Sequence, residues 1–137
     1  MAATNQISYV TISSAGNATD FGDMSTAKER VQGLSSSTRC CMAGGSGGEG
    51  LNVIEYVTIA STGNTTDFGD LTVARNYTVG ISNKTRGVYC GGNVGGVGNN
   101  VMDYITIASV GNASDFGDLT DTVTHASGSS NAHGGIA

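Results

Sequence analysis

Apolar residues occur along the chain in short stretches of β-branched and aromatic side chains, separated by glycine and small polar residues. Residues 7–12 form one such stretch, which runs into Gly16 and Asn17, two residues that readily adopt positive φ in a tight turn. A second apolar stretch follows this turn at residues 19–24. The pattern predicts short strands joined by tight turns, with no helix.

This strand-and-turn unit is repeated. Residues 9–23, 56–70 and 104–118 align without a gap, and ten of the fifteen positions are identical in all three copies. A second element, which ends in a double glycine, occurs at residues 37–45 and again at residues 84–92. Residues 132–137 hold a degenerate third copy of this element. The repeat length of 47 or 48 residues places the chain among the repeat architectures.

Each repeat holds four predicted strands. Residues 7–12 and 19–24 supply two of them in the first copy. Residues 77–81, with residues 31–34 as a weaker copy, supply a third kind, and residues 87–92 supply the fourth. Four short strands in about 47 residues, each bounded by glycine, asparagine or serine, are typical of a β-propeller blade.

Composition excludes several classes of protein. The chain has 6 Lys and Arg against 11 Asp and Glu, a net charge of −5, and only 12% charged residues. Because no basic stripe is present to neutralise phosphates, we predict no nucleic-acid binding. No run of 18 apolar residues occurs and residues 1–6 do not look like a secretion signal, so we expect neither membrane insertion nor secretion.

The double-glycine element, followed 11 or 12 residues later by a strand tyrosine, resembles the kelch repeat of β-propellers over nearly the whole chain. Kelch blades usually carry a tryptophan downstream of that tyrosine, and here a phenylalanine takes its place. The amino-acid sequence of the repeats is also similar to that of repeats in structural, tail or fibre proteins of marine bacteriophages, notably cyanophages. The repeat framework consists of Tyr9, Phe21, Tyr56, Phe68, Tyr104, Phe116, Gly44, Gly45, Gly91 and Gly92.

In the kelch register, residues 27–73 and 74–121 are two whole blades. Residues 1–26 supply half a blade at the N-terminus, and residues 122–137 supply the other half at the C-terminus. One chain therefore holds three blades' worth of strands, whereas propellers close with about four to eight blades. We predict a head-to-tail homodimer with six blades, in which each half-blade is completed by the other copy.

Two alternatives to the homodimer are compatible with the same number of strands. If the head-to-tail contact did not close by rotation, it would build a filament. The chain could also be a fragment of a longer propeller.

The acidic pairs are the first candidate for chemistry. Spaced three residues apart and repeated around a propeller axis, they could form a ring of oxygen ligands for Ca²⁺. The alternative, which we favour because every copy carries the pair, is that these carboxylates accept backbone N–H groups and hold turns. The candidates are Asp20, Asp23, Asp67, Asp70, Asp115 and Asp118.

The remaining reactive residues favour structural roles. We expect Cys40, Cys41 and Cys90 to pack as small apolar side chains. The alternative is one disulfide that joins Cys90 to Cys40 or to Cys41. His125 and His133 lack a second cluster at metal-ligand spacing, so zinc is not predicted. The glycine-rich residues 44–50 and 91–98 lack the Lys and helix of a phosphate loop and are predicted to be flexible connections.

Four cations recur at matching repeat positions. They could pair with aspartates of a neighbouring blade, or they could line a sugar-binding groove. Exposed pairs of this kind contribute only about 0–1 kcal/mol each. The four are Lys28, Arg39, Arg75 and Arg86.

No set of nucleophile, base and oxyanion donors converges in the sequence, so we predict a non-enzymatic protein with no cofactor. The resemblance to phage repeats implies a structural or host-contact module of a virion, assembled in the host cytoplasm and contacting other virion proteins. The alternative is a lectin-like propeller that binds host surface glycans. Tyr77 and Tyr89 are the two aromatic residues outside the framework that could stack on a sugar.

Overall fold

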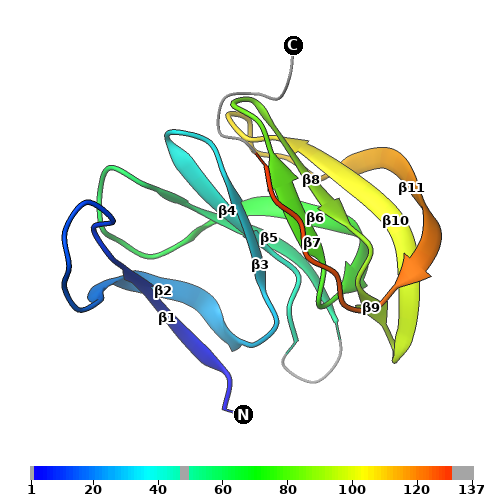
Figure 1. The fold of residues 1–137 in the computed structure, drawn as a ribbon, viewed down its shortest axis with the longest axis horizontal. Helices are drawn as coiled ribbons and strands as arrows, with labels where there is room; N and C mark the ends of the chain where they lie inside the picture. The colour runs from blue at the N-terminus through cyan, green and yellow to red at the C-terminus, as the bar shows by residue number, and fades with distance from the viewer. Residues whose placement is uncertain (1, 47–49, 131–137) are drawn as a thin grey trace.

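The computed structural model describes residues 2–46 and 50–130, and every regular element in these ranges is a β-strand (Figure 1). The prediction of an all-β chain is confirmed. No helix in this described part is long and apolar enough to cross a lipid bilayer. The strands are β1 (Thr4–Tyr9), β2 (Thr19–Lys28), β3 (Gln32–Ser35), β4 (Arg39–Ala43), β5 (Leu51–Thr58), β6 (Thr66–Arg75), β7 (Val79–Ser82), β8 (Arg86–Cys90), β9 (Asn93–Val94), β10 (Val97–Thr106) and β11 (Ser114–Val123).

The strands form three antiparallel groups in chain order. Strands β1 and β2 pair as a hairpin, and β3-β4-β5-β6 form a sheet in which each strand pairs with its neighbour in sequence. Strands β7-β8-β10-β11 form the third group, with the short β9 paired to β10 alone. Figure 1 shows the three groups side by side, from the blue β1–β2 hairpin to the orange β11.

The longest hairpins, β1–β2, β5–β6 and β10–β11, share the same irregularities. In the β5–β6 hairpin the register shifts between Leu51 and Val53 and again between Ile54 and Glu55. Shifts occur at the equivalent positions of the other two hairpins. Because a β-bulge bends a strand and increases its twist, the three hairpins share one curvature.

The first strand differs in length from the predicted one. We expected a strand over residues 7–12, but β1 begins at Thr4 and ends at Tyr9. Its equivalents β5 and β10 continue to Thr58 and Thr106, where each still pairs with a second neighbour, β4 or β8. Strand β1 has one neighbour, β2, among the described residues, so residues 10–12 have no strand to pair with.

The second glycine-rich segment is a small hairpin and not the flexible connection we predicted. Val94 of β9 pairs with Val97 of β10, and Gly95 and Gly96 lie between them with φ of +58° and +92°. Positive φ at both central residues is the requirement of the tight turns that match strand twist, and glycine meets it without strain. The first such segment includes residues 47–49, which lie outside the described residues.

The first strands of the two sheets lie against each other. A Cβ atom on Gly80 of β7 would come within 2.7 Å of the carbonyl oxygen of Gly33 in β3. Residues 126–130 run beside β7 in the same way (Figure 1), and a Cβ on Gly128 would lie 2.4 Å from the Val79 side chain. Gly33, Gly80 and Gly128 are equivalent repeat positions, so three copies of one segment pack side by side.

The hydrophobic core lies between sheet β3–β6 and sheet β7–β11. Tyr89 is fully buried there, and its hydroxyl donates a 3.0 Å hydrogen bond to the carbonyl oxygen of Cys41. The core is therefore the contact between two repeats, and each sheet needs its neighbour to cover its apolar face. Its buried members are Leu34, Cys41, Ala43, Ile54, Phe68, Leu71, Tyr89, Ile105 and Ile107.

The predicted blade boundaries stay predictions. The two sheets span Gln32 to Arg75 and Val79 to Val123, a few residues later than the predicted units 27–73 and 74–121. Of the predicted C-terminal half-blade, residues 131–137 lie outside the described residues, and His133 is among them.

Candidate interaction surfaces

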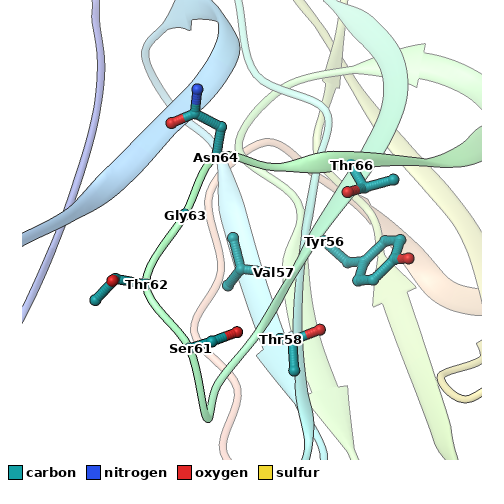
Figure 2. A pocket seen from close by; sticks show the side chains of 8 residues that line it. All are labelled: Tyr56, Val57, Thr58, Ser61, Thr62, Gly63, Asn64 and Thr66. Atoms are coloured by element: carbon teal, nitrogen blue, oxygen red, sulfur yellow. The ribbon is translucent and has the colours of Figure 1, made fainter.

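The chain contains the same sheet-to-sheet contact twice. The first junction joins the β1–β2 hairpin to sheet β3–β6, and the second joins sheet β3–β6 to sheet β7–β11. At each junction the loop between the last two strands of one sheet lies against the last strand of the preceding group. Figure 2 shows this loop at the first junction, with Gly63 and Asn64 beside the neighbouring β2 ribbon.

At the first junction the loop adds backbone hydrogen bonds to β2. Gly63 N–H donates to the carbonyl of Phe21 at 2.7 Å, and Thr65 N–H donates to the carbonyl of Asp23 at 2.9 Å. Between them, the Asn64 side-chain oxygen Oδ1 accepts the Asp23 N–H at 3.0 Å. The loop thus satisfies the free edge of β2 as a short extra strand would.

The second junction repeats these bonds one unit later. Gly111 N–H donates to the carbonyl of Phe68 at 2.7 Å, and Ala113 N–H donates to the carbonyl of Asp70 at 2.8 Å. Asn112 Oδ1 accepts the Asp70 N–H at 3.1 Å. The recurring Gly-Asn pair therefore serves the contact between repeats and is not a local turn signal alone.

The aspartate-phenylalanine-glycine motif has its glycine where the loop approaches most closely. A Cβ atom on Gly22 would lie 2.2 Å from the carbonyl oxygen of Gly63, and one on Gly69 would lie 2.5 Å from the Gly111 carbonyl. Both glycines have φ near +145°, at +148° and +141°. Close approach and backbone conformation together require glycine here.

A buried ion pair crosses each junction. Lys28 Nζ lies 2.6 Å from Glu55 Oε2, and Arg75 Nη2 lies 2.7 Å from Asp103 Oδ2, with all four side chains at most 3% exposed. The sequence left two roles open for the cations at these positions, exposed pairs with the repeated aspartates or a sugar-binding groove. The actual partners are the acidic residues that precede the framework tyrosines, and the pairs are buried.

Backbone groups anchor both members of the second pair. Arg75 donates to the carbonyls of Tyr89 at 3.1 Å and Val101 at 3.0 Å. Asp103 accepts hydrogen bonds from the backbone N–H and the hydroxyl of Thr72. A buried charge is tolerated when it is paired and hydrogen-bonded, and this network stabilises the pair in the interior. Arg75 Nε is the exception, because it is buried with no hydrogen-bond partner among the described residues.

The first pair gives stability a dependence on pH. Burial acts to raise the pKa of Glu55, but hydrogen bonds from Lys28 and Ser25 and the Lys28 charge outweigh it and hold the pKa below its ordinary value of 4.5. A carboxyl with a lowered folded-state pKa stabilises the fold above its unfolded pKa, and this contribution is lost as the pH falls through the folded-state pKa.

We therefore expect the free energy of unfolding to decrease as the pH drops below about 4.5, the ordinary pKa of this carboxyl. Urea unfolding at a series of pH values measures this, with Glu55→Gln as the control. The variant should be less stable at neutral pH and should show a shallower acid dependence. An unchanged slope in Glu55→Gln would contradict the assignment.

Among the described residues, the first and last groups of strands each present one half of this junction without the other half. Phe68 is 2% exposed at the second junction, whereas its equivalent Phe116 in β11 is 50% exposed. Ile107 is 1% exposed, whereas its equivalent Ile12 beside β1 is 96% exposed. These residue types are thus buried at the second junction and exposed at the two ends, with Ile59 at the first junction in between at 45% exposed.

The aromatic framework forms pairs within each repeat. Arg39 and Arg86 place their guanidinium groups 4.4 Å and 5.0 Å from the ring centroids of Tyr56 and Tyr104. These two cations therefore pack on framework rings and not on aspartates. The ring pairs, with centroids about 6 Å apart in edge-to-face geometry, are Tyr9–Phe21, Tyr56–Phe68 and Tyr104–Phe116.

The predicted acidic pairs occupy strands β2, β6 and β11. The backbone N–H and C=O groups of Asp23 and Asp70 form the hydrogen bonds across the junctions described above. Asp115 Oδ1 accepts the N–H of Gly117 at 3.1 Å. That last bond is of the local turn type that we favoured. Within residues 2–46 and 50–130, no three His, Cys, Asp or Glu side chains are grouped as a metal site would need.

The two tyrosines considered for sugar stacking are already engaged. Tyr89 has no exposed surface. The ring centroids of Tyr77 and His125 are 4.0 Å apart. The Cζ atom of the Arg30 guanidinium lies 5.0 Å from the Tyr77 ring centroid. Arg30, Tyr77 and His125 occupy equivalent repeat positions, so their stack is a further contact between repeats. A hollow of about 140 Å³ lies beside them.

The cysteines are free, and Cys41 and Cys90 are buried. Burial, with a smaller effect of Cys40, raises the pKa of Cys41 to about 12 despite the opposing charge of Arg39. Burial also raises the pKa values of Cys40 and Cys90. Thiols with raised pKa values are mostly protonated near neutral pH, which is unsuited to nucleophilic catalysis.

Glu55 and Asp103 are the residues that sequence reasoning missed. Alignment of the repeats places Ser8, Glu55 and Asp103 at one position and Lys28, Arg75 and Val123 at another, a covariation that could have indicated the pairs. Comparison with protein-family models finds none that matches this chain, and comparison with curated proteins finds no match either.

Proposed function

We propose that this protein is a non-enzymatic structural module that assembles with copies of itself into a β-propeller, with its sheets as blades. The observation that carries this proposal is the junction that occurs twice inside the chain and is left half-filled at both ends. Phe116 at one end and Ile12 at the other are exposed, whereas their equivalents at the second junction, Phe68 and Ile107, are buried. Exposed apolar faces of this kind mark interaction sites.

The strand inventory supports closure by a second copy. The β1–β2 hairpin corresponds to the last two strands of sheet β3–β6 and lacks the first two. Residues 126–130 lie beside β7, where the first strand of a further blade belongs. A half-blade at each end completes one blade when two copies meet, and two chains then give six blades, within the usual range of about four to eight.

The cellular role that we propose is a structural or host-contact part of a bacteriophage particle. Its support is the similarity of the repeats to those of marine phage structural, tail or fibre proteins. A ring of short strands with turns on each face presents loops on a rigid scaffold, which suits contact with other virion proteins or with a host surface.

Light scattering coupled to size-exclusion chromatography tests the assembly. We expect twice the chain mass of 13.7 kDa. Particles that lengthen with concentration would instead indicate the filament, in which the same contact fails to close. A monomer at high micromolar concentration would refute self-assembly.

A further inference from the structure

We propose that the loop at residues 16–18 of one copy docks on strand β11 of a second copy at Phe116 and Asp118. This inference rests on the proposed self-assembly and names the surfaces that carry it. The N-face comprises Ser8, Val10, Ile12 and residues 16–18. The C-face comprises Ile81, Val88, Phe116, Asp118, Leu119 and Val123.

The backbone bonds of the two internal junctions define the docked geometry. Gly63 and Gly111 donate to the carbonyls of Phe21 and Phe68, and the equivalent pair is Gly16 with Phe116 of a second copy. By the same repeat spacing, Ala18 N–H donates to the carbonyl of Asp118. Asn17 Oδ1 accepts the Asp118 N–H, as Asn64 and Asn112 do inside the chain.

The loop and its acceptor edge are both accessible. Gly16, Asn17 and Ala18 are exposed, and so are Phe116 and Asp118. Among the described residues, the nearest atom to a Cβ on Gly117 would be the Met102 methyl at 3.9 Å, whereas the internal Gly69 lies under the backbone of the next loop. The position above Gly117 is therefore free to receive a loop.

The N-face and the C-face both lack the charged residue that forms a buried ion pair at the internal junctions. Each internal junction buries a cation on one side and a carboxylate on the other. At the ends, Val123 replaces the cation and Ser8 replaces the carboxylate, so both members of the pair are absent together. A face that kept one charge would bury it unpaired in the docked state, at a large cost.

Apolar surface is also complementary. In the second junction, Ile105 and Ile107 pack into one core with Leu34, Cys41, Phe68 and Leu71. The repeat equivalents of Ile105 and Ile107 are Val10 and Ile12, and both are exposed. The repeat equivalents of Leu34, Cys41, Phe68 and Leu71 are each exposed or half-buried. In the same order they are Ile81, Val88, Phe116 and Leu119. These two sets form the interior of the docked junction.

The contact is heterologous, so each copy carries one N-face and one C-face. This arrangement can be tested by blocking one face at a time. An N-face variant, Asn17→Ala with Ala18→Pro, removes the side-chain acceptor and one backbone donor. A C-face variant, Phe116→Glu, places a carboxylate where an apolar ring would be buried. Val97→Glu, an exposed apolar position on the β9–β10 hairpin, is the matched control.

We expect the wild type and Val97→Glu to assemble equally in sedimentation equilibrium. The N-face variant should raise the dissociation constant about tenfold or more, because it loses two hydrogen bonds. The C-face variant should raise it on the order of a hundredfold, because a charge is buried without a partner. In an equimolar mixture, the heterodimer keeps one junction unmodified and carries both changes at the other, so its dissociation constant should lie between those of the two variant homodimers.

Each result decides between distinct failures. A monomeric wild type would refute both self-assembly and this docking. A wild-type dimer whose affinity neither variant changes would leave self-assembly standing and overturn the docking. A heterodimer that is no tighter than the Phe116→Glu homodimer would also overturn it, because no unmodified junction would then contribute to its affinity. Circular dichroism of each variant, matched to that of Val97→Glu, verifies that the strands are intact.

Discussion

Replacing Arg75 with valine should lower the free energy of unfolding by about 3–5 kcal/mol, the usual cost of leaving a buried charge without its partner. Asp103 has a fully buried side chain, and Arg75 Nη2 is 2.7 Å from it. Valine also leaves the carbonyls of Tyr89 and Val101 without the donors that Arg75 supplies. Urea unfolding followed by circular dichroism measures the change.

The sequence itself offers the matched control for this prediction. Val123 and Ser8 occupy the Arg75 and Asp103 positions of the repeat, so the double variant Arg75→Val with Asp103→Ser installs residues that these repeat positions carry in other copies. We expect the double variant to be more stable than Arg75→Val, because no unpaired carboxylate remains. A double variant that loses the sum of the two single losses would show that the charges act independently.

Substituting alanine for Gly69 should be nearly as damaging, at about 4 kcal/mol. The backbone there has φ of +141°, which costs a residue with a side chain about 1–3 kcal/mol. A Cβ atom would also lie 2.5 Å from the Gly111 carbonyl, which forces the two sheets apart and adds about 1–3 kcal/mol. Thermal and urea unfolding measure the loss.

Gly117→Ala separates these two contributions. Gly117 has a similar φ of +130°, but among the described residues the nearest atom to its Cβ position is the Met102 methyl at 3.9 Å. Measured in the Phe116→Glu background, where assembly is weakened, this variant should lose only the backbone part, about 1–3 kcal/mol. Equal losses at Gly69 and Gly117 would contradict a structural role for the close approach between sheets.

The difference between internal and terminal copies has a simple physical origin. Each sheet has an apolar face on both sides, and one face is buried only when a further sheet packs on it. Phe68 and Phe116 have the same neighbours within their own hairpins, including the ring of a framework tyrosine. They differ in burial because only Phe68 has a following sheet.

Much of this architecture could be predicted from the residues alone. The β-branched stretches, the Gly-Asn turns and the absence of helical segments specify strands, because these preferences act within a few residues. The three copies at 47 or 48 residues specify that the strands form repeating groups. The framework rings of each repeat, such as Tyr56 and Phe68, were also found from repetition.

Contacts between repeats were decided only in three dimensions. Lys28 and Glu55 are far apart in sequence and are joined by packing of one sheet on the next, so no local preference marks them as partners. Asn64 looks like a turn residue, yet its side chain accepts a hydrogen bond from Asp23 in another group of strands. The end of β1 at Tyr9 likewise reflects a missing neighbour strand and not its own sequence.

The all-β class, the repeat length and the recurring residues follow from the order of amino acids alone, because strand propensity and turn geometry are local properties of the chain. The fold was needed to show which charges are buried, which glycines lie under a neighbouring backbone and which apolar side chains remain exposed at the two ends. These outcomes depend on how neighbouring sheets approach one another, and that distance is set by packing across repeats and not by any single stretch of residues.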